Sequence, residues 1–169
     1  MHVSRDPSSR NRTMRRILTW ILIVGALIFI GLQFIGPART NPPFDQSQTL
    51  EATTAVSPDI AAIFARSCND CHSNKTNWRW YTYVAPVSWF TVGHVNEGRG
   101  ELNFSTWGTY GARMKETRLK AICAQCRGGE MPLPSYALVH RDVRLSSAEV
   151  EMICAWTERT RKELETAPH

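Results

Sequence analysis

The chain has 169 residues, and its 20 Lys and Arg against 15 Asp and Glu give a formal net charge of +5. The first 16 residues contain five Arg and one Asp, so they carry +4 of this charge and leave about +1 for the rest of the chain. A nucleic-acid-binding domain needs a basic surface of its own, so this distribution excludes nucleic acid as an expected partner.

Residues 17–36 form a stretch of twenty residues without a charge. At about 1.5 Å of rise per residue, such a helix crosses the roughly 30 Å hydrocarbon core of a bilayer. The basic tail over residues 1–16 predicts, by the positive-inside rule, a cytoplasmic N-terminus and an exported remainder. A cleaved signal peptide is the alternative, but the stretch exceeds the usual h-region of about 7–15 residues and no small-residue cleavage site follows it closely. We therefore predict an uncleaved single-pass anchor in a bacterial inner membrane, with a periplasmic domain.

Residues 37–56 are rich in Pro, Thr, Gln and Ser and poor in apolar side chains. This composition predicts a flexible linker. The folded domain is then expected over residues 57–166, a length typical of one domain. It opens with a helix, because Ser57 is a good N-cap residue and Pro58 suits the first helical position.

This first helix leads into Cys-Asn-Asp-Cys-His at residues 68–72. Two cysteines separated by two residues and followed at once by histidine have the spacing at which a c-type haem is attached. Cys68 and Cys71 would form thioethers with the two vinyl groups of the porphyrin, and His72 would donate an imidazole nitrogen to the iron. The motif therefore predicts one covalently bound haem c. Export fits this prediction, because haem attachment and disulfide formation both belong to the oxidising side of the membrane.

An aromatic cluster follows the motif within thirteen residues, made of Trp78, Trp80, Tyr81, Tyr83, Trp89 and Phe90. A porphyrin needs a large apolar pocket, so we expect Trp78, Trp80 and Trp89 to contact the haem. Arg79 and Arg99 are candidates for ion pairs with the haem propionates.

Three further helices are predicted, over residues 87–101, 115–127 and 146–164. The first is weakened by three glycines, and the second ends at Gly128-Gly129. The last begins with Ser146 and Glu149 at capping-box spacing. No segment has a convincing strand pattern. We therefore expect an all-α fold, a small helical domain with long loops preceded by one N-terminal transmembrane helix.

Met131 and Pro132 lie in the loop before the last helix, fifty-nine residues after His72. A methionine thioether on a proline-stiffened loop can complete six-coordination of the iron opposite the histidine. We predict that Met131 is the sixth ligand. His94 is the alternative, since it shares a predicted helical face with Val87 and the aromatic Phe90.

The order of these parts, helix, CxxCH, long loop, G-x-M-P and terminal helix, resembles a class I c-type cytochrome. The chain is more closely similar to the bacterial haem-binding domain family of short membrane-anchored proteins. The matching stretches are SCNDCHSNKTNWRWYTYVAPVSWF, HVNEGRGELNFSTW and GEMPLPSYALVHRDVRLSSAEVEMICAWT, within residues 57–158. This resemblance implies a cytochrome c-like fold and covalent binding of haem c.

Three cysteines remain after the motif. A disulfide between Cys123 and Cys154 would join two helices, contribute about 2–4 kcal/mol and leave Cys126 as a thiol. A Cys123–Cys126 bridge is the alternative and would be more redox-active. A zinc site that uses both CxxC pairs is disfavoured, because fifty-one residues separate Cys71 from Cys123 and common zinc modules have about 15–20. A thiol oxidoreductase is equally disfavoured, because no βαβ pattern surrounds the second pair.

The sequence thus favours an electron carrier with His72 and Met131 as axial ligands. Its partners would be redox proteins of the respiratory chain or the periplasm. The alternative is a haem peroxidase or ligand sensor, which needs an open iron site with His94 or Arg99 as distal groups.

Overall fold

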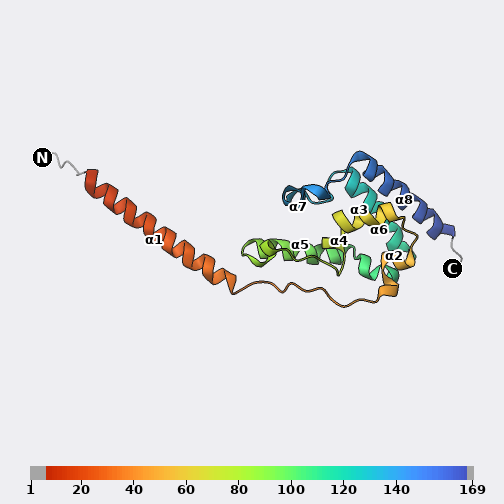
Figure 1. The fold of residues 1–169 in the computed structure, drawn as a ribbon, viewed down its shortest axis with the longest axis horizontal. Coiled ribbons are helices and arrows are strands. Elements are labelled where there is room, and N and C mark those ends of the chain that lie inside the picture. Colours follow the sequence, from red (N-terminus) through yellow and green to blue (C-terminus); the bar gives the residue numbers. More distant parts are fainter. Residues whose placement is uncertain (1–6, 167–169) are drawn as a thin grey trace. The chain divides into compact units, whose positions relative to one another are not determined.

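The computed structural model describes residues 7–166 of the chain. Within this range the protein forms eight α-helices and four short 3₁₀ helices, and it contains no strand (Figure 1). The prediction of an all-α fold is therefore confirmed. The chain divides into two compact units. The α1 unit comprises the chain up to Ala38 together with Arg79–Val92, and the core unit comprises Arg39–Trp78 together with the chain from Gly93 onward.

The α1 unit is built on α1 (Pro7–Gln33), the longest helix of the chain. Its part from Arg10 to Gln33 has a mean hydropathy of 2.0 in its most apolar window, and none of that window is buried inside the protein. By length and composition this helix can cross a membrane. It ends three residues before the predicted boundary at residue 36.

The remainder of the α1 unit is η2 (Trp80–Tyr83) and the first turns of α5 (Val87–Glu101). Two hydrogen bonds join this segment to the end of α1. The backbone N–H of Ala85 donates to Oε1 of Gln33 at 2.9 Å, and the indole Nε1 of Trp89 donates to the carbonyl of Ile35 at 3.0 Å. The segment is therefore attached to the end of the long helix by two hydrogen bonds, each between a backbone group and a side chain.

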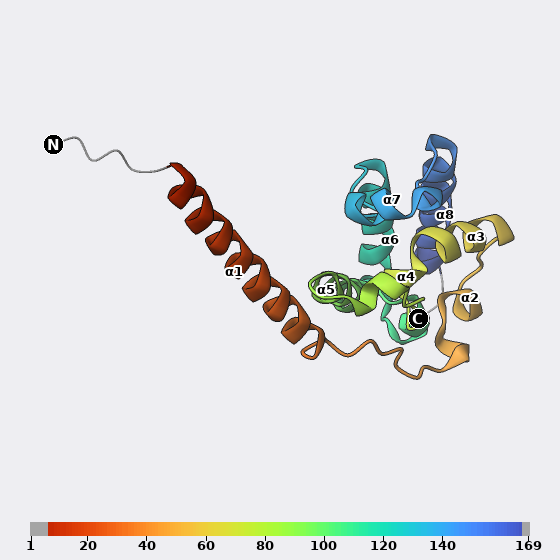
Figure 2. The same cartoon turned by 60° about the vertical axis from the view of Figure 1, so that its left-hand side comes forward.

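The core unit contains the remaining elements and the rest of α5. They are η1 (Gln46–Gln48), α2 (Leu50–Thr53), α3 (Pro58–Ser67), α4 (Asn69–His72), η3 (Phe104–Thr109), α6 (Ala112–Arg127), α7 (Pro134–Val139), η4 (Arg141–Val143) and α8 (Ser147–Thr166). Helices α6 and α8 pack side by side (Figures 1 and 2). The predicted helices over 115–127 and 146–164 correspond to α6 and α8, and α6 begins three residues earlier than predicted.

Three aromatic rings form the centre of the core unit. Phe64 of α3 stacks on Phe104 of η3 at 5.1 Å between ring centroids, and it meets Trp156 of α8 edge-on at 5.3 Å. All three side chains are buried. Aromatic pairs of this geometry add to the free energy gained by burying their area, so the contacts fix α3, η3 and α8 against one another.

Part of the segment 37–56 differs from its prediction as a flexible linker. Leu50 is completely buried in the core, and η1 and α2 pack against η3. Two buried tryptophans also donate hydrogen bonds to this segment. The indole N–H of Trp107 donates to Thr54 Oγ1 at 3.0 Å, and that of Trp156 donates to the carbonyl of Ala55 at 2.9 Å. The polar composition of this segment predicted a linker. Its polar side chains and backbone carbonyls instead accept the hydrogen bonds that buried indoles need.

Candidate haem-binding site

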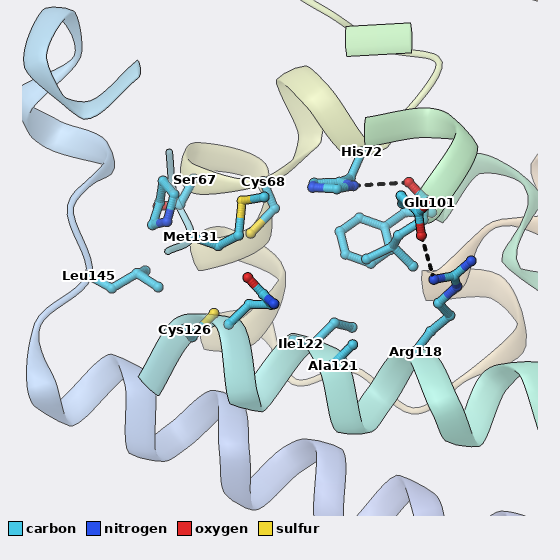
Figure 3. A pocket seen from close by; sticks show the side chains of 14 residues that line it. Ser67, Cys68, His72, Glu101, Arg118, Ala121, Ile122, Cys126, Met131 and Leu145 are labelled. Carbon is cyan, nitrogen blue, oxygen red and sulfur yellow. Dashed lines mark hydrogen bonds and ion pairs between the residues drawn. The ribbon is translucent and has the colours of Figure 1, made fainter. Parts of the chain in front are cut away.

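A cavity of about 300 Å³ opens within the core unit, between α4 and α6 (Figure 3). Most of its wall is apolar, formed by Leu102, Phe104, Ala121, Ile122, Pro132 and Leu145. Its polar and sulfur-bearing lining residues are Ser67, Cys68, His72, Glu101, Arg118, Gln125, Cys126 and Met131. A mostly apolar cavity with a few convergent polar groups is the usual form of a cofactor site.

One face of α6 forms a long wall of the cavity. Five residues of α6 line it at spacings of three, four, seven and eight positions from the first, namely Arg118, Ala121, Ile122, Gln125 and Cys126. These spacings put all five side chains on one side of the helix. From Arg118 to Cys126 the wall extends for about 12 Å, at 1.5 Å per residue.

His72 is held in a single orientation by two backbone carbonyls. Its Nδ1 lies 3.0 Å from the carbonyl oxygen of Gly98 and 3.0 Å from that of Leu102. Because carbonyl oxygens only accept, Nδ1 carries the proton and Nε2 keeps its lone pair. Burial lowers the pKa of His72 against the opposing effect of these two hydrogen bonds, so the ring stays neutral. The ring is therefore prepared to coordinate a metal through Nε2.

The CxxCH motif folds as the one-turn helix α4, which starts directly after Cys68. The backbone N–H of His72 donates to the Cys68 carbonyl at 2.9 Å, so a single turn carries the motif. Cys68 and Cys71 are free thiols, and only Cys68 lines the cavity. Burial raises the pKa of Cys71 to about 11 and raises that of Cys68 further above its ordinary value. Both sulfurs are therefore protonated thiols near neutral pH, not thiolates.

Met131 reaches the cavity from the loop that follows α6. This helix ends at Arg127, and Gly129 turns the chain with a φ of +72°, a conformation that favours glycine. The backbone N–H of Met131 then donates to the Gln125 carbonyl at 3.2 Å. The loop is thereby folded back onto the end of α6, with Met131 and Cys68 at the same end of the cavity (Figure 3).

An ion pair lies at the other end of the cavity (Figure 3). Nη1 of Arg118 donates to Oε2 of Glu101 at 2.8 Å. Among the described residues that line the cavity, these two carry the permanent charges. The cavity is therefore chemically asymmetric, with sulfur atoms at one end and a guanidinium at the other.

The residues of the cavity are chemically suited to a haem, because an apolar wall surrounds the His72 imidazole, the Met131 thioether and the Cys68 thiol. A family model for a haem-binding domain matches residues 27–159. The chain belongs to the haem-binding domain family. No curated protein and no solved structure matches the chain. The matched range contains every residue that lines the cavity.

Three of the predicted site residues of this haem-binding domain meet in the cavity, namely Cys68, His72 and Met131. None of the tryptophans predicted to contact haem is among the described lining residues. Trp80 and Trp89 belong to the α1 unit, and Trp78 lies beneath the guanidinium of Arg99 at 5.9 Å. The aromatic ring that does line the cavity is Phe104, which the sequence analysis did not single out.

The two predicted distal groups also lie outside the lining of the cavity. Nδ1 of His94 is 3.7 Å from a carboxylate oxygen of Glu97, one turn away on α5. Arg99 donates to four oxygen acceptors, the carbonyls of Ser73 and Thr40 and the side chains of Asn41 and Thr76. This guanidinium fastens the start of the core unit to the loop after the CxxCH motif.

The two cysteines of the second CxxC pair, Cys123 and Cys126, are in different states. Cys123 of α6 forms a disulfide with Cys154 of α8, with Cα atoms 4.8 Å apart, and Cys126 lines the cavity as a thiol. This is the helix-to-helix pairing that the sequence favours over a Cys123–Cys126 bridge. A zinc site with four cysteine ligands is incompatible with it, because Cys123 has no thiolate to offer. Residues 7–166 contain no group of three His, Cys, Asp or Glu suited to a metal ion.

Proposed function

We propose that this haem-binding protein is a membrane-anchored c-type cytochrome that transfers electrons on the exported side of a bacterial inner membrane. The observation that carries the proposal is the meeting of Cys68, His72 and Met131 in one cavity, although fifty-nine residues separate the last two along the chain. Bound haem would supply one-electron redox chemistry.

In this proposal Cys68 and Cys71 hold one haem by thioether bonds, and His72 is the proximal ligand. The two carbonyls on Nδ1 of His72 keep the ring from rotating and reserve Nε2 for the iron. The residues of the cavity fit a haem by their types and by their positions around one apolar space.

Met131 is the proposed sixth ligand. A thioether is a weak neutral donor, so its loop must be held in place, and the hydrogen bond from its N–H to Gln125 does this. If His72 and Met131 both held the iron, a small molecule would have to displace Met131 to bind, which favours electron transfer over catalysis. The positions of His94 and Arg99 outside the cavity lining lend no support to a peroxidase or sensor that uses them as distal groups.

Arg118 is the residue that we propose for pairing with a haem propionate, in place of Arg79 or Arg99. The vinyl and propionate groups of a porphyrin lie on opposite sides of the ring. The sulfur end of the cavity would suit the vinyl groups, and the guanidinium end would suit the propionates (Figure 3). Glu101, the present partner of Arg118, has a largely exposed carboxylate, which water would solvate if a propionate replaced it.

The proposed topology rests on the basic tail and on α1. Five arginines lie ahead of the apolar stretch of α1, four of them in the first part of the helix itself, so the tail stays in the cytoplasm and the core unit is exported to the periplasm. The Cys123–Cys154 disulfide supports export to an oxidising compartment. Redox proteins of the respiratory chain or the periplasm are the proposed partners.

Absorption spectra of the full chain, expressed with a haem-attachment system, test this function. We expect haem that survives denaturation and extraction in the wild type and is lost in a Cys68→Ala/Cys71→Ala variant. The ferric protein should show the weak band near the red edge of the spectrum that reports a Met–iron bond. This band should disappear in Met131→Ala and persist in the matched control Met152→Ala, which alters a methionine of α8 outside the cavity.

Two outcomes would contradict the proposal. A high-spin ferric spectrum, together with rapid carbon monoxide binding by the reduced wild type, would indicate an open iron site and favour the peroxidase or sensor. A spectrum that changes in His94→Ala and not in Met131→Ala would assign the sixth position to His94.

A further inference from the structure

The aromatic segment, defined as Arg79–Val92 of the α1 unit, exposes large apolar side chains. Trp80 is 79% exposed and Phe90 is 56% exposed. Tyr83, Val87 and Trp89 are exposed as well. In the core unit, by contrast, the rings of Phe64, Phe104, Trp107 and Trp156 are all buried. An apolar patch of this kind marks a surface that meets something other than water.

The aromatic segment is attached to the point where α1 ends. Ala85 donates to the side chain of Gln33, the last residue of α1, and Trp89 donates to the carbonyl of Ile35 just beyond it. Ile35 lies two residues after the end of α1, and its carbonyl accepts the hydrogen bond of the Trp89 indole. If α1 crosses a bilayer, these two contacts hold the aromatic segment near the level at which α1 leaves the hydrocarbon.

The composition of the aromatic segment suits that level. Trp and Tyr are enriched at membrane–water interfaces, because their rings are apolar and their N–H or O–H groups remain hydrogen-bonded. The segment contains two Trp, two Tyr and one Phe within fourteen residues, and its one charged residue is the cationic Arg79. It has no carboxylate that lipid phosphates would repel.

We propose that the aromatic segment inserts its exposed side chains into the phospholipid headgroup layer of the leaflet from which α1 emerges. The chain would then contact the membrane through two elements, one that crosses the bilayer and one that lies in its surface. The inference rests on the membrane anchor in the proposed function and is independent of haem ligation.

Photolabelling of the full chain in phosphatidylcholine vesicles tests this proposal. The vesicles contain a phosphatidylcholine with a diazirine close to its glycerol backbone. After irradiation, cleavage at Lys and Arg releases residues 17–39 from α1, 80–99 from the aromatic segment, and 128–141 around α7. We expect lipid adducts on the first two peptides and none on the third. The third is a matched control, because its Leu138 and Val139 are 72% and 65% exposed.

Variants localise the labelled surface. Trp80→Ser/Phe90→Ser should lose most adducts on residues 80–99 and keep those on residues 17–39. Leu138→Ser/Val139→Ser should change neither yield. Adducts on 17–39 without any on 80–99 would overturn the inference. Absence of adducts on 17–39 would refute the anchor itself, while the haem spectrum of the same sample reports separately on the haem site.

Discussion

The two units of this protein differ in where several of their large aromatic side chains lie, buried in the core unit and exposed in the α1 unit. In the core unit, Trp107 and Trp156 are buried and their indole N–H groups donate to the segment before α3. In the α1 unit, Trp80 and Phe90 are exposed, and Trp89 donates to the backbone beside α1. The same residue types therefore build a protein interior in one unit and an outer surface in the other. A cluster of aromatic residues in a sequence indicates an apolar environment, but it does not say whether protein or lipid supplies it.

Replacing one tryptophan in each unit is the strongest test of this contrast. Trp107→Ala should lower the free energy of unfolding by about 3–5 kcal/mol, because a buried ring and a satisfied indole are both lost. Trp80→Ala should change it by less than about 0.5 kcal/mol, since its ring is mostly exposed. Urea unfolding of the full chain in detergent, followed by circular dichroism, measures both values. Equal losses would mean that Trp80 also packs against protein.

The disulfide should stabilise the core unit alone, because the α1 unit contains no cysteine. Cys123→Ala/Cys154→Ala removes a cross-link across a separation of 31 residues, and we expect a loss of about 2–4 kcal/mol in unfolding free energy. A reductant should destabilise the wild type by a similar amount and leave the double variant unaffected. A reductant effect that survives in the double variant would assign the stabilisation to some other thiol chemistry.

Two glycines of α5 differ in how closely they pack against α4. A Cβ at Gly98 would lie 2.8 Å from the carbonyl oxygen of Cys71, whereas a Cβ at Gly100 would meet nothing within 4 Å. Gly98→Ala should therefore cost about 1–3 kcal/mol by overpacking, and Gly100→Ala should be neutral or stabilise by up to about 1 kcal/mol. Thermal unfolding of the two variants side by side measures the difference. Similar midpoints would show that α4 can move away without cost.

The smallest expected effect is at the surface of the core unit, where Glu149 caps α8. Its pKa is lowered to about 2, first by the hydrogen bond from the Ser146 N–H and then by Arg66, whose Nη2 lies 2.7 Å from it. A carboxyl with a depressed pKa contributes stability above its unfolded pKa of about 4.3 and loses it as the pH falls toward 2. Glu149→Gln should therefore cost about 1 kcal/mol at pH 7, because solvent screens this partly exposed site, and almost nothing near pH 2.

Unfolding at both pH values measures this effect, and Glu151→Gln is the matched control on the same helix. Glu151 pairs with Arg127 at 2.9 Å with both side chains largely exposed, so its replacement should cost less than about 0.5 kcal/mol at either pH. A cost at Glu149 that stays the same at pH 2 would exclude ionisation as its source.

The parts of the fold that sequence reasoning predicted are those that depend on neighbours in the chain. Ser57 caps α3, with its Oγ 3.5 Å from the N–H of Ile60. Ser146 and Glu149 form the predicted reciprocal capping box, with hydrogen bonds of 2.8 and 3.3 Å. Such signals are complete within four residues, so the sequence alone contains them.

The parts that sequence reasoning missed depend on long-range packing. The Arg118–Glu101 ion pair joins residues seventeen positions apart that share no motif, and Phe104 enters the cavity from a 3₁₀ turn without a clear periodicity. Leu50 belongs to the core although its surroundings are polar. Burial is decided by which segments meet, and local composition does not contain that information.

The carbonyls on Nδ1 of His72 have an electronic consequence. They come from Gly98 in the last turn of α5 and from Leu102 just beyond it, where aligned peptide dipoles concentrate about half a negative elementary charge. That charge, held against the imidazole N–H, makes Nε2 a stronger electron donor to any metal bound there, and so favours the metal's higher oxidation state. A thioether such as that of Met131 acts in the opposite sense. If the protein is the cytochrome that we propose, the end of α5 and Met131 would shift its reduction potential in opposite directions.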